Sequence, residues 1–237
     1  MKDAILQIQE LQLRHPSEGV GVLNLNIQAG EGVVVLGRNG TGKSTLLKTV
    51  AGLIRPAKGQ VLLAGQEVGV MSPRDRAQEL ALVFSTPPKD SPLTVRDVME
   101  LAVDASGRSY DPDEVGAAME RGRIDAWADR PMSILSDGMA QRVMMVRAFV
   151  QAKSLVLMDE PTAFLDVVAR RDFMNDVGRW CAQGKSVVLA THDLEAVEQA
   201  GWAHRWLLVR PPEQGGSLLM DKPFSAEEAR QLLLSHA

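Results

Sequence analysis

Cysteine, tyrosine and long apolar runs are all scarce in this sequence of 237 residues. The one cysteine, Cys181, has no second cysteine for an internal disulfide and no companions for a zinc site, which favours a reducing compartment. No segment approaches the roughly 18 consecutive apolar residues of a membrane span, and the N-terminus lacks a secretory pattern. The sequence therefore predicts a cytosolic chain, and any role at a membrane would require another chain.

A large excess of one charge is also missing. The 26 Lys and Arg residues nearly balance the 30 Asp and Glu residues, and the net charge is −4. Such a balance does not favour wrapping nucleic acid or lying on an anionic membrane. The content of 45% hydrophobic residues is enough for a sizeable core. We therefore expect no nucleic-acid partner, and any phosphate chemistry must depend on local groups.

Short apolar segments alternate with amphipathic ones along the chain. "GVVVLG" (32–37), "SLVLMDE" (154–160) and "KSVVLATH" (185–192) are typical of buried strands, and "STLLKTVAGLI" (44–54) has helical spacing. This alternation is typical of α/β proteins with a parallel sheet, which bind ligands at the carboxyl ends of their strands. "QVLLAGQEV" (60–68) predicts a strand, a turn and a second strand.

Two further regions predict helices. From Thr94 to about Pro131 the periodicity is helical without a convincing strand, which indicates an inserted helical lobe. Near the end of the chain, Ser225 is followed three positions later by Glu228, which is the pattern of a capping box before a terminal helix.

The strongest motif is "GRNGTGKST", which follows a predicted strand and precedes a predicted helix. Its glycines allow backbone N–H groups to surround a phosphate, Lys43 reaches the terminal phosphates, and Ser44 is placed to hold Mg²⁺. The expected nucleotide-binding residues are Gly37, Arg38, Asn39, Gly40, Thr41, Gly42, Lys43, Ser44 and Thr45.

A phosphate-binding loop alone leaves kinases, GTPases and motor ATPases open. Asp159 ends the apolar strand in "LVLMDEP", where it would meet Mg²⁺ through water, and Glu160 is placed to act as a general base on the attacking water. His192 ends the next apolar strand and could reach a γ-phosphate across the sheet edge. Two adjacent acids favour hydrolysis, and Lys43, Glu160 and His192 are the candidate catalytic residues.

Together with "LSDGM" (135–139), these motifs make nearly the whole chain resemble the ATPase subunits of ABC transporters. The resemblance implies an α/β fold: a P-loop NTPase core with a mostly parallel sheet, an N-terminal antiparallel β subdomain and an inserted α-helical subdomain. It also implies that residues 1–237 form a single domain, with the helical subdomain at about 94–135.

In such ATPases the signature helix faces the γ-phosphate of ATP on the other subunit of a head-to-tail dimer. The resemblance assigns this role to Ser136, Asp137, Gly138 and Met139. An exposed helix N-terminus is a suitable place for an anion. Asp137 stands where the family usually has glycine, and Met139 where it has glutamine. A carboxylate there repels a triphosphate unless it points away or caps the helix.

The resemblance assigns four further positions. Asp166 in "TAFLD" corresponds to the D-loop, which touches the partner subunit, and His192 to the switch histidine that contacts the γ-phosphate. His15 stands where an aromatic ring stacks on adenine. Ser85 stands where the Q-loop glutamine is expected, and its shorter side chain could act on Mg²⁺ only through water.

The function implied is that of an ATP-hydrolysing subunit of a bacterial importer, with ATP and Mg²⁺ as cofactors. Its expected partners are a second ATPase subunit in a homodimer, a transmembrane permease and, indirectly, a substrate-binding protein. The chain would then be cytoplasmic and peripheral on the inner face of the membrane. The Ser-Asp-Gly signature and "PTAFLD" resemble the ATPases of iron-siderophore, haem and cobalamin uptake.

Two alternatives remain open from the residues. One is a soluble ABC-type ATPase in an assembly or maintenance complex without a membrane partner. The other is a small P-loop kinase, which would leave "LSDGM", "TAFLD" and His192 without roles.

Overall fold

Five of the apolar segments form parallel strands of one sheet, with a sixth, antiparallel strand at its edge. The computed structural model describes residues 4–14, 21–209, 217–221 and 225–234. The sheet has the strand order β10-β9-β3-β8-β7-β6. Every residue of β3, β7 and β8 is buried, as expected for central strands covered on both faces. The strands are β3 (Gly32–Leu36), β6 (Leu80–Val83), β7 (Leu155–Asp159), β8 (Ser186–Ala190), β9 (Arg205–Leu208) and β10 (Leu218–Asp221).

A second, antiparallel sheet has the order β2-β1-β4-β5. Buried and exposed residues alternate along β2, so one of its faces is in the core. This face and the six-stranded sheet share a hydrophobic cluster with helix α1. The predicted α/β class, with a mostly parallel sheet and an antiparallel one, is confirmed. The bounds are β1 (Ala4–Gln12), β2 (Leu23–Gln28), β4 (Lys58–Leu63), β5 (Gln66–Glu67) and α1 (Lys43–Val50).

The other face of the six-stranded sheet is covered by helices, which enclose a second hydrophobic cluster. These are α5 (Asp137–Gln151), α6 (Val167–Ala182), α7 (Leu194–Ala200) and α8 (Ala226–Leu234), while α2 (Pro73–Glu79) precedes β6. The predicted capping box is confirmed before α8, since the Glu228 amide donates to Ser225 Oγ at 3.1 Å and the Ser225 amide donates to Glu228 Oε2 at 2.9 Å. Among the described residues, none of the helices combines the length and apolar character needed to cross a membrane.

One predicted helix is shorter than expected. The periodicity of Ser44–Ile54 suggested a helix up to Ile54, but α1 ends at Val50 and Leu53 is 56% exposed. Gly52 adopts a φ of +69°, in the left-handed region that ends helices. The apolar pattern therefore continued past the helix into a turn.

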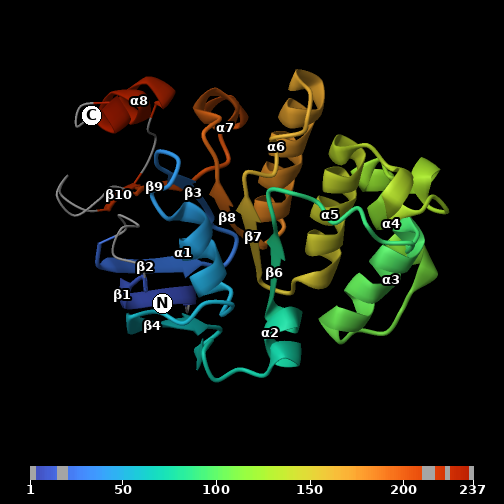
Figure 1. Cartoon of the computed structure of the whole chain (residues 1–237), viewed down its shortest axis with the longest axis horizontal. Helices are drawn as coiled ribbons and strands as arrows, with labels where there is room; N and C mark the ends of the chain where they lie inside the picture. Colours follow the sequence, from blue (N-terminus) through green and yellow to red (C-terminus); the bar gives the residue numbers. More distant parts are fainter. Residues whose placement is uncertain (1–3, 15–20, 210–216, 222–224, 235–237) are drawn as a thin grey trace.

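A helical lobe lies at the far end of the molecule from the antiparallel sheet (Figure 1). It contains α3 (Val95–Ser106), α4 (Pro112–Gly122) and two short 3₁₀ turns (Asp125–Trp127 and Met132–Ile134). The lobe has its own hydrophobic cluster, to which α5 contributes Ala140, Val143 and Val146. Other residues of α5, including Met145, Ala148 and Phe149, belong to the cluster of the sheet. Helix α5 therefore joins the lobe to the core.

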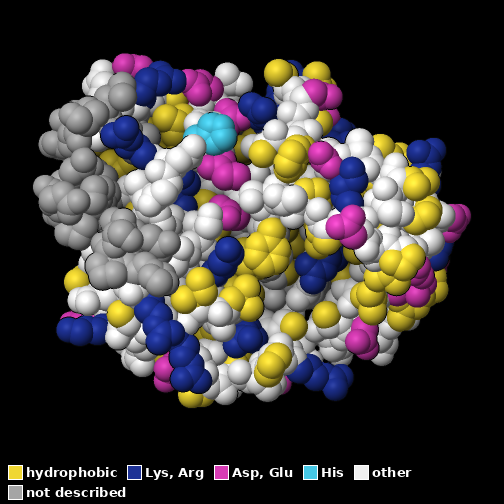
Figure 2. Space-filling model, viewed as in Figure 1, with side chains coloured by type: hydrophobic (Ala, Val, Ile, Leu, Met, Phe, Trp, Pro, Cys, Tyr) yellow, Lys and Arg dark blue, Asp and Glu magenta, His cyan; other side chains and the backbone are white. Residues whose placement is uncertain are grey.

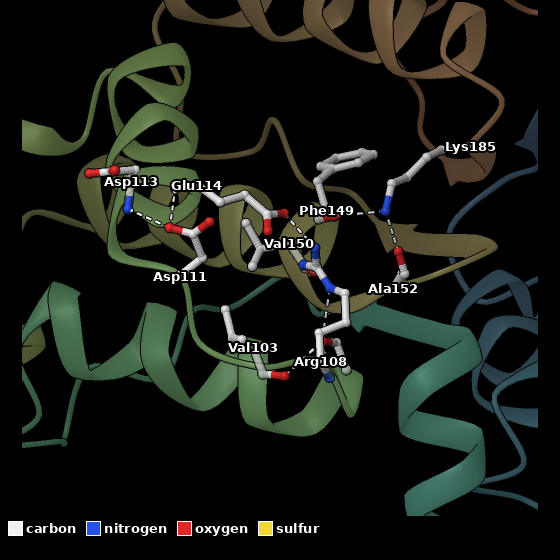
Figure 3. Close-up of polar contacts among 10 residues, drawn as sticks. Val103, Arg108, Asp111, Asp113, Glu114, Phe149, Val150, Ala152 and Lys185 are labelled. Atoms are coloured by element: carbon white, nitrogen blue, oxygen red, sulfur yellow. Dashed lines mark hydrogen bonds and ion pairs between the residues drawn. The ribbon is translucent and has the colours of Figure 1, made fainter.

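Two cations hold the carboxyl end of α5 (Figure 3). Arg108, just beyond α3, donates to the Val150 carbonyl at 2.8 Å and pairs with Glu114 of α4. Lys185, just before β8, donates to the carbonyls of Phe149, at 2.9 Å, and Ala152. Positive groups at this end donate hydrogen bonds to the last carbonyls and interact favourably with the negative end of the helix dipole. The lobe and the sheet are thus attached to one helix end.

Cys181, on α6, packs in the cluster between the helices and the sheet. Burial raises the pKa of its thiol to about 11, from an ordinary value of 9.0. Above pH 9 the unfolded chain loses the thiol proton, while the folded chain keeps it up to about pH 11. The unfolded state then binds fewer protons, so this group lowers the free energy of unfolding as the pH rises through that window.

We therefore expect wild type to lose more stability between pH 9 and pH 11 than Cys181→Ala, in which this titration is absent. Urea unfolding across this range measures the difference, and lysine and tyrosine titrations cancel because both chains contain them. Parallel pH profiles would contradict the burial of this thiol.

Candidate active site

The loop between β3 and α1 has the geometry of a phosphate cradle. Gly40 and Gly42 adopt φ values of +79° and +93°, which residues other than glycine rarely adopt. Lys43 is only 7% exposed and folds back over the loop, where its Nζ donates to the Gly37 carbonyl at 2.8 Å and to the Arg38 carbonyl at 3.3 Å. The loop is therefore closed by the lysine that is expected to meet the phosphates.

A pocket of about 260 Å³ opens above this loop. Most of the predicted nucleotide-binding residues line it, whereas Gly37, Arg38 and Thr41 shape the loop behind it. Burial lowers the pKa of Lys43, and the carboxylates of Glu160 and Asp159 oppose that shift. The lining residues are Asn39, Gly40, Gly42, Lys43, Ser44, Thr45, Asp159 and Glu160.

The donor groups in this pocket fit Mg²⁺. Ser44 offers a hydroxyl and Asp159, which is 6% exposed, offers a carboxylate, and hard cations prefer such oxygen ligands. The described residues contain no group of three or more His, Cys, Asp or Glu side chains that could hold a metal by themselves. Mg²⁺ commonly takes its remaining ligands from water and substrate phosphates. Ser44 and Asp159, beside a phosphate-binding loop, would leave the remaining positions around Mg²⁺ to water and phosphate oxygens.

Glu160 and His192 are in direct contact. Glu160 Oε2 lies 2.8 Å from His192 Nδ1, and the Glu160 amide donates to the Ala190 carbonyl at 2.9 Å. Glu160 has a φ of +46°, a conformation that residues other than glycine rarely adopt and that is frequent at functional sites. Its side chain is 19% exposed, whereas that of His192 is 75% exposed. The arrangement keeps the carboxylate over the pocket and leaves the imidazole facing outward.

The signature residues lie outside this pocket. Ser136 is the N-cap of α5, and its Oγ accepts the Met139 amide at 3.2 Å. The Asp137 carboxylate does not remain unpaired, because its Oδ1 lies 2.8 Å from Lys89 Nζ. A Cβ on Gly138 would stand 2.8 Å from the Phe164 carbonyl, so only glycine lets α5 approach that loop so closely.

Two other predicted residues also stand apart from the pocket. Asp166 is the N-cap of α6, and its Oδ1 accepts the Ala169 amide at 2.8 Å. Ser85 is half-buried just beyond β6, and it does not line the pocket. His15 lies outside the described residues.

Sequence reasoning did not identify Lys89 or Gln141. Gln141 is fully buried on α5 and donates its Nε2 to the Phe84 carbonyl at 3.0 Å, just after β6. Neither residue belongs to a motif recognisable on its own, and both contacts join segments more than 40 residues apart. Only the folded chain reveals them.

Over the face shown in Figure 2, acidic and basic side chains are interspersed, in line with the balanced composition.

Comparison with known proteins identifies the family. Residues 20–163 match the model of the ABC transporter family. The chain is 34% identical over 179 residues to the iron(3+)-hydroxamate import ATP-binding protein FhuC of Bacillus subtilis, covering 73% of this chain and 66% of that protein. It is 32% identical over 180 residues to the hemin import ATP-binding protein HmuV of Rhodopseudomonas palustris, covering 73% and 67%.

A solved structure agrees with these relatives. One described as "Structure of ATP binding subunit of ABC transporter" superposes with a TM-score of 0.78 at 26% identity, covering 87% of this chain and 86% of that one. The resemblance predicted from the motifs is thereby confirmed, together with a fold of the P-loop ATPase kind. The chain belongs to the ABC transporter family, as one of its ATP-binding ATPase subunits.

Proposed function

We propose that this chain is the ATP-hydrolysing subunit of a membrane importer, and that two copies close around two ATP molecules to drive a separate permease. One observation carries the proposal: the predicted site is divided. Lys43, Ser44, Asp159 and Glu160 line one pocket, whereas Ser136 caps a helix outside it. A complete site then needs the signature helix of a second copy.

On the first copy, the loop amides and Lys43 would bind the β- and γ-phosphates of ATP. Ser44 and Asp159 would hold Mg²⁺, which neutralises charge on the phosphates when it is bound. The folded-back position of Lys43 supports this role, since its Nζ already lies against the backbone of the loop, where it donates to the Gly37 carbonyl. We assign nucleotide contacts in the loop to residues 37–45, and stacking on adenine to His15.

Glu160 would act as the general base and His192 would contact the γ-phosphate. Glu160 and the γ-phosphate both accept hydrogen bonds, so the contact with Glu160 requires a hydrogen on His192 Nδ1 and the contact with a phosphate oxygen requires one on Nε2. The hydrogen bond orients the carboxylate toward the water that it deprotonates. The two residues therefore act as a pair, and His192 links the base to the incoming phosphate.

Exposed apolar side chains surround the elements assigned to the partner. Ile134 is 67% exposed beside Ser136, and Phe164 and Val167, beside Asp166, are 44% and 79% exposed. Large apolar groups that gather around polar contact residues are typical of surfaces that another protein covers. This supports a homodimer in which Ser136, Asp137, Gly138 and Met139 meet the partner's ATP and Asp166 meets the partner chain.

We infer further that residues 1–237 act as one ABC ATPase domain, with the helical subdomain at about 94–135 receiving the permease. The separate hydrophobic cluster of this lobe supports its treatment as a subdomain. Ser85, at the Q-loop position, would act through water. The chain would then be cytoplasmic, bound to the inner face of the membrane through the permease, with a substrate-binding protein as an indirect partner.

The names of the relatives support the direction of transport and a class of cargo. Both are described as import ATP-binding proteins, one for iron(3+)-hydroxamate and one for hemin. We propose an importer of the iron-siderophore, haem and cobalamin group. Affinity purification from membranes tests this proposal: an integral membrane protein should co-purify, and its absence would favour a soluble assembly ATPase.

Glu160→Gln should leave ATP binding intact and slow turnover by about 100-fold or more, because the neutral amide cannot accept a proton from water. The stalled chain should accumulate as an ATP-bound dimer, which light scattering detects. Glu198→Gln, the same change at an exposed position on α7, is the control and should hydrolyse ATP like wild type. Unchanged turnover in Glu160→Gln would remove Glu160 from its role.

Ser136→Ala should impair hydrolysis more than it weakens the affinity of the monomer for ATP. Ser72 offers a matched control because it also caps a helix, accepting the Asp75 amide at 3.1 Å. Each substitution should cost about 1 kcal/mol of stability through loss of the cap. Only Ser136→Ala should reduce ATP turnover, and equal turnover in the two variants would show that Ser136 is merely a cap.

A further inference from the structure

Asp137, the residue that departs most in charge from the usual signature, has a cationic partner. Lys89 Nζ lies 2.8 Å from Asp137 Oδ1, and the two side chains are 34% and 51% exposed. Lys89 comes from the connection between β6, which ends at Val83, and α3, which begins at Val95. The contact therefore joins the segment at the Q-loop position to the first turn of the signature helix.

A second contact ties the same two elements together. Gln141 lies one helical turn beyond Asp137 and donates to the Phe84 carbonyl at 3.0 Å. Between Phe84 and Lys89, the consecutive residues Pro87 and Pro88 restrict the backbone, and Pro87 is buried. The segment Phe84–Lys89 is thus held at both ends against α5, so the position of the lysine depends on the position of the segment.

The charge at this helix end matters for the proposed sandwich. A helix N-terminus attracts a phosphate through its free amides, but a carboxylate in the first turn adds a negative charge at the same place. Repulsion between that carboxylate and a triphosphate grows as water leaves the closing interface. Asp137 without a partner would therefore oppose the approach of the other subunit's ATP.

Stability of the fold does not account for the ion pair. An exposed pair of this kind contributes little to folding, because solvent screens it and ordering the side chains costs entropy. The helix already has its cap from Ser136. The pair should therefore affect the encounter with the nucleotide far more than it affects folding.

We propose that Lys89 is a positioning residue that neutralises Asp137 and so permits the signature helix to receive the partner's ATP. The segment that carries Lys89 is held against α5 at both ends, so the cation stays beside the carboxylate. The inference rests on the proposed function, since it requires the ATP-bound dimer.

A double-mutant cycle tests the role of Lys89. Lys89→Ala should reduce ATP turnover by about tenfold or more, and Lys89→Arg, which keeps the charge, should restore most of it. In an Asp137→Gly chain, removal of Lys89 should change turnover by less than about twofold, because no carboxylate remains to be neutralised. The defect of Lys89→Ala should shrink as salt rises, because ions screen the uncompensated charge.

Lys153 provides the control, since its side chain is exposed and its Nζ lies 2.9 Å from Glu79 Oε1 in a second pair of lysine with a carboxylate. Lys153→Ala and Lys89→Ala should have melting temperatures close to wild type, and only Lys89→Ala should lose activity. An equal loss of activity in the presence and absence of Asp137 would overturn the proposal, as would wild-type turnover in Lys89→Ala.

The Glu160→Gln background separates the two hypotheses. If Glu160→Gln forms no dimer with ATP, the proposed function fails. If it dimerises and Lys89→Ala in that background dimerises at the same ATP concentration, the function stands and the inference about Lys89 fails. The expected result is dimerisation that requires about tenfold more ATP without Lys89, with no change in the binding of a fluorescent ATP analogue to the monomer.

Discussion

The parallel pairing of three buried strands is the constraint on which the rest of the structure depends. Val35 of β3 is in register with Ala190 of β8, and Ala190 with Asp159 of β7. The strands therefore end together, and the phosphate loop, the adjacent acids and His192 emerge at one edge of the sheet. Hydrogen bonds and packing hold this register, because a shift by one residue would move every side chain to the opposite face of the sheet and disrupt both hydrophobic clusters. The chemistry follows from where the strands end.

Helix α5 extends this order to the lobe. One set of its side chains packs with the lobe and another with the sheet, while Arg108 and Lys185 hold its carboxyl end (Figure 3). Because a helix is stiff, fixing one end places the other, where Ser136 is exposed. In the proposed dimer, the same helix that joins the lobe to the core would present its N-terminus to the nucleotide of the other copy.

One departure from the usual family residues, the aspartate at position 137, has a local compensation. A carboxylate at Asp137 faces the positive end of α5 and pairs with Lys89, so the helix end keeps an overall charge suited to an anion. The cation is supplied by a segment that is itself attached to α5 through Gln141. Charge at the proposed subunit interface and the position of the connecting segment are therefore linked in this chain.

Neighbours along the chain are enough to predict the phosphate loop, the apolar strand that ends in Asp159 and the capping box of Ser225 with Glu228. Local backbone preferences and short spacings suffice for these. The contact of Glu160 with His192 and the pairing of Lys89 with Asp137 depend instead on the tertiary structure. The two contacts join residues 32 and 48 positions apart, so they exist only after the strands and helices have packed. No pattern within one segment contains that information.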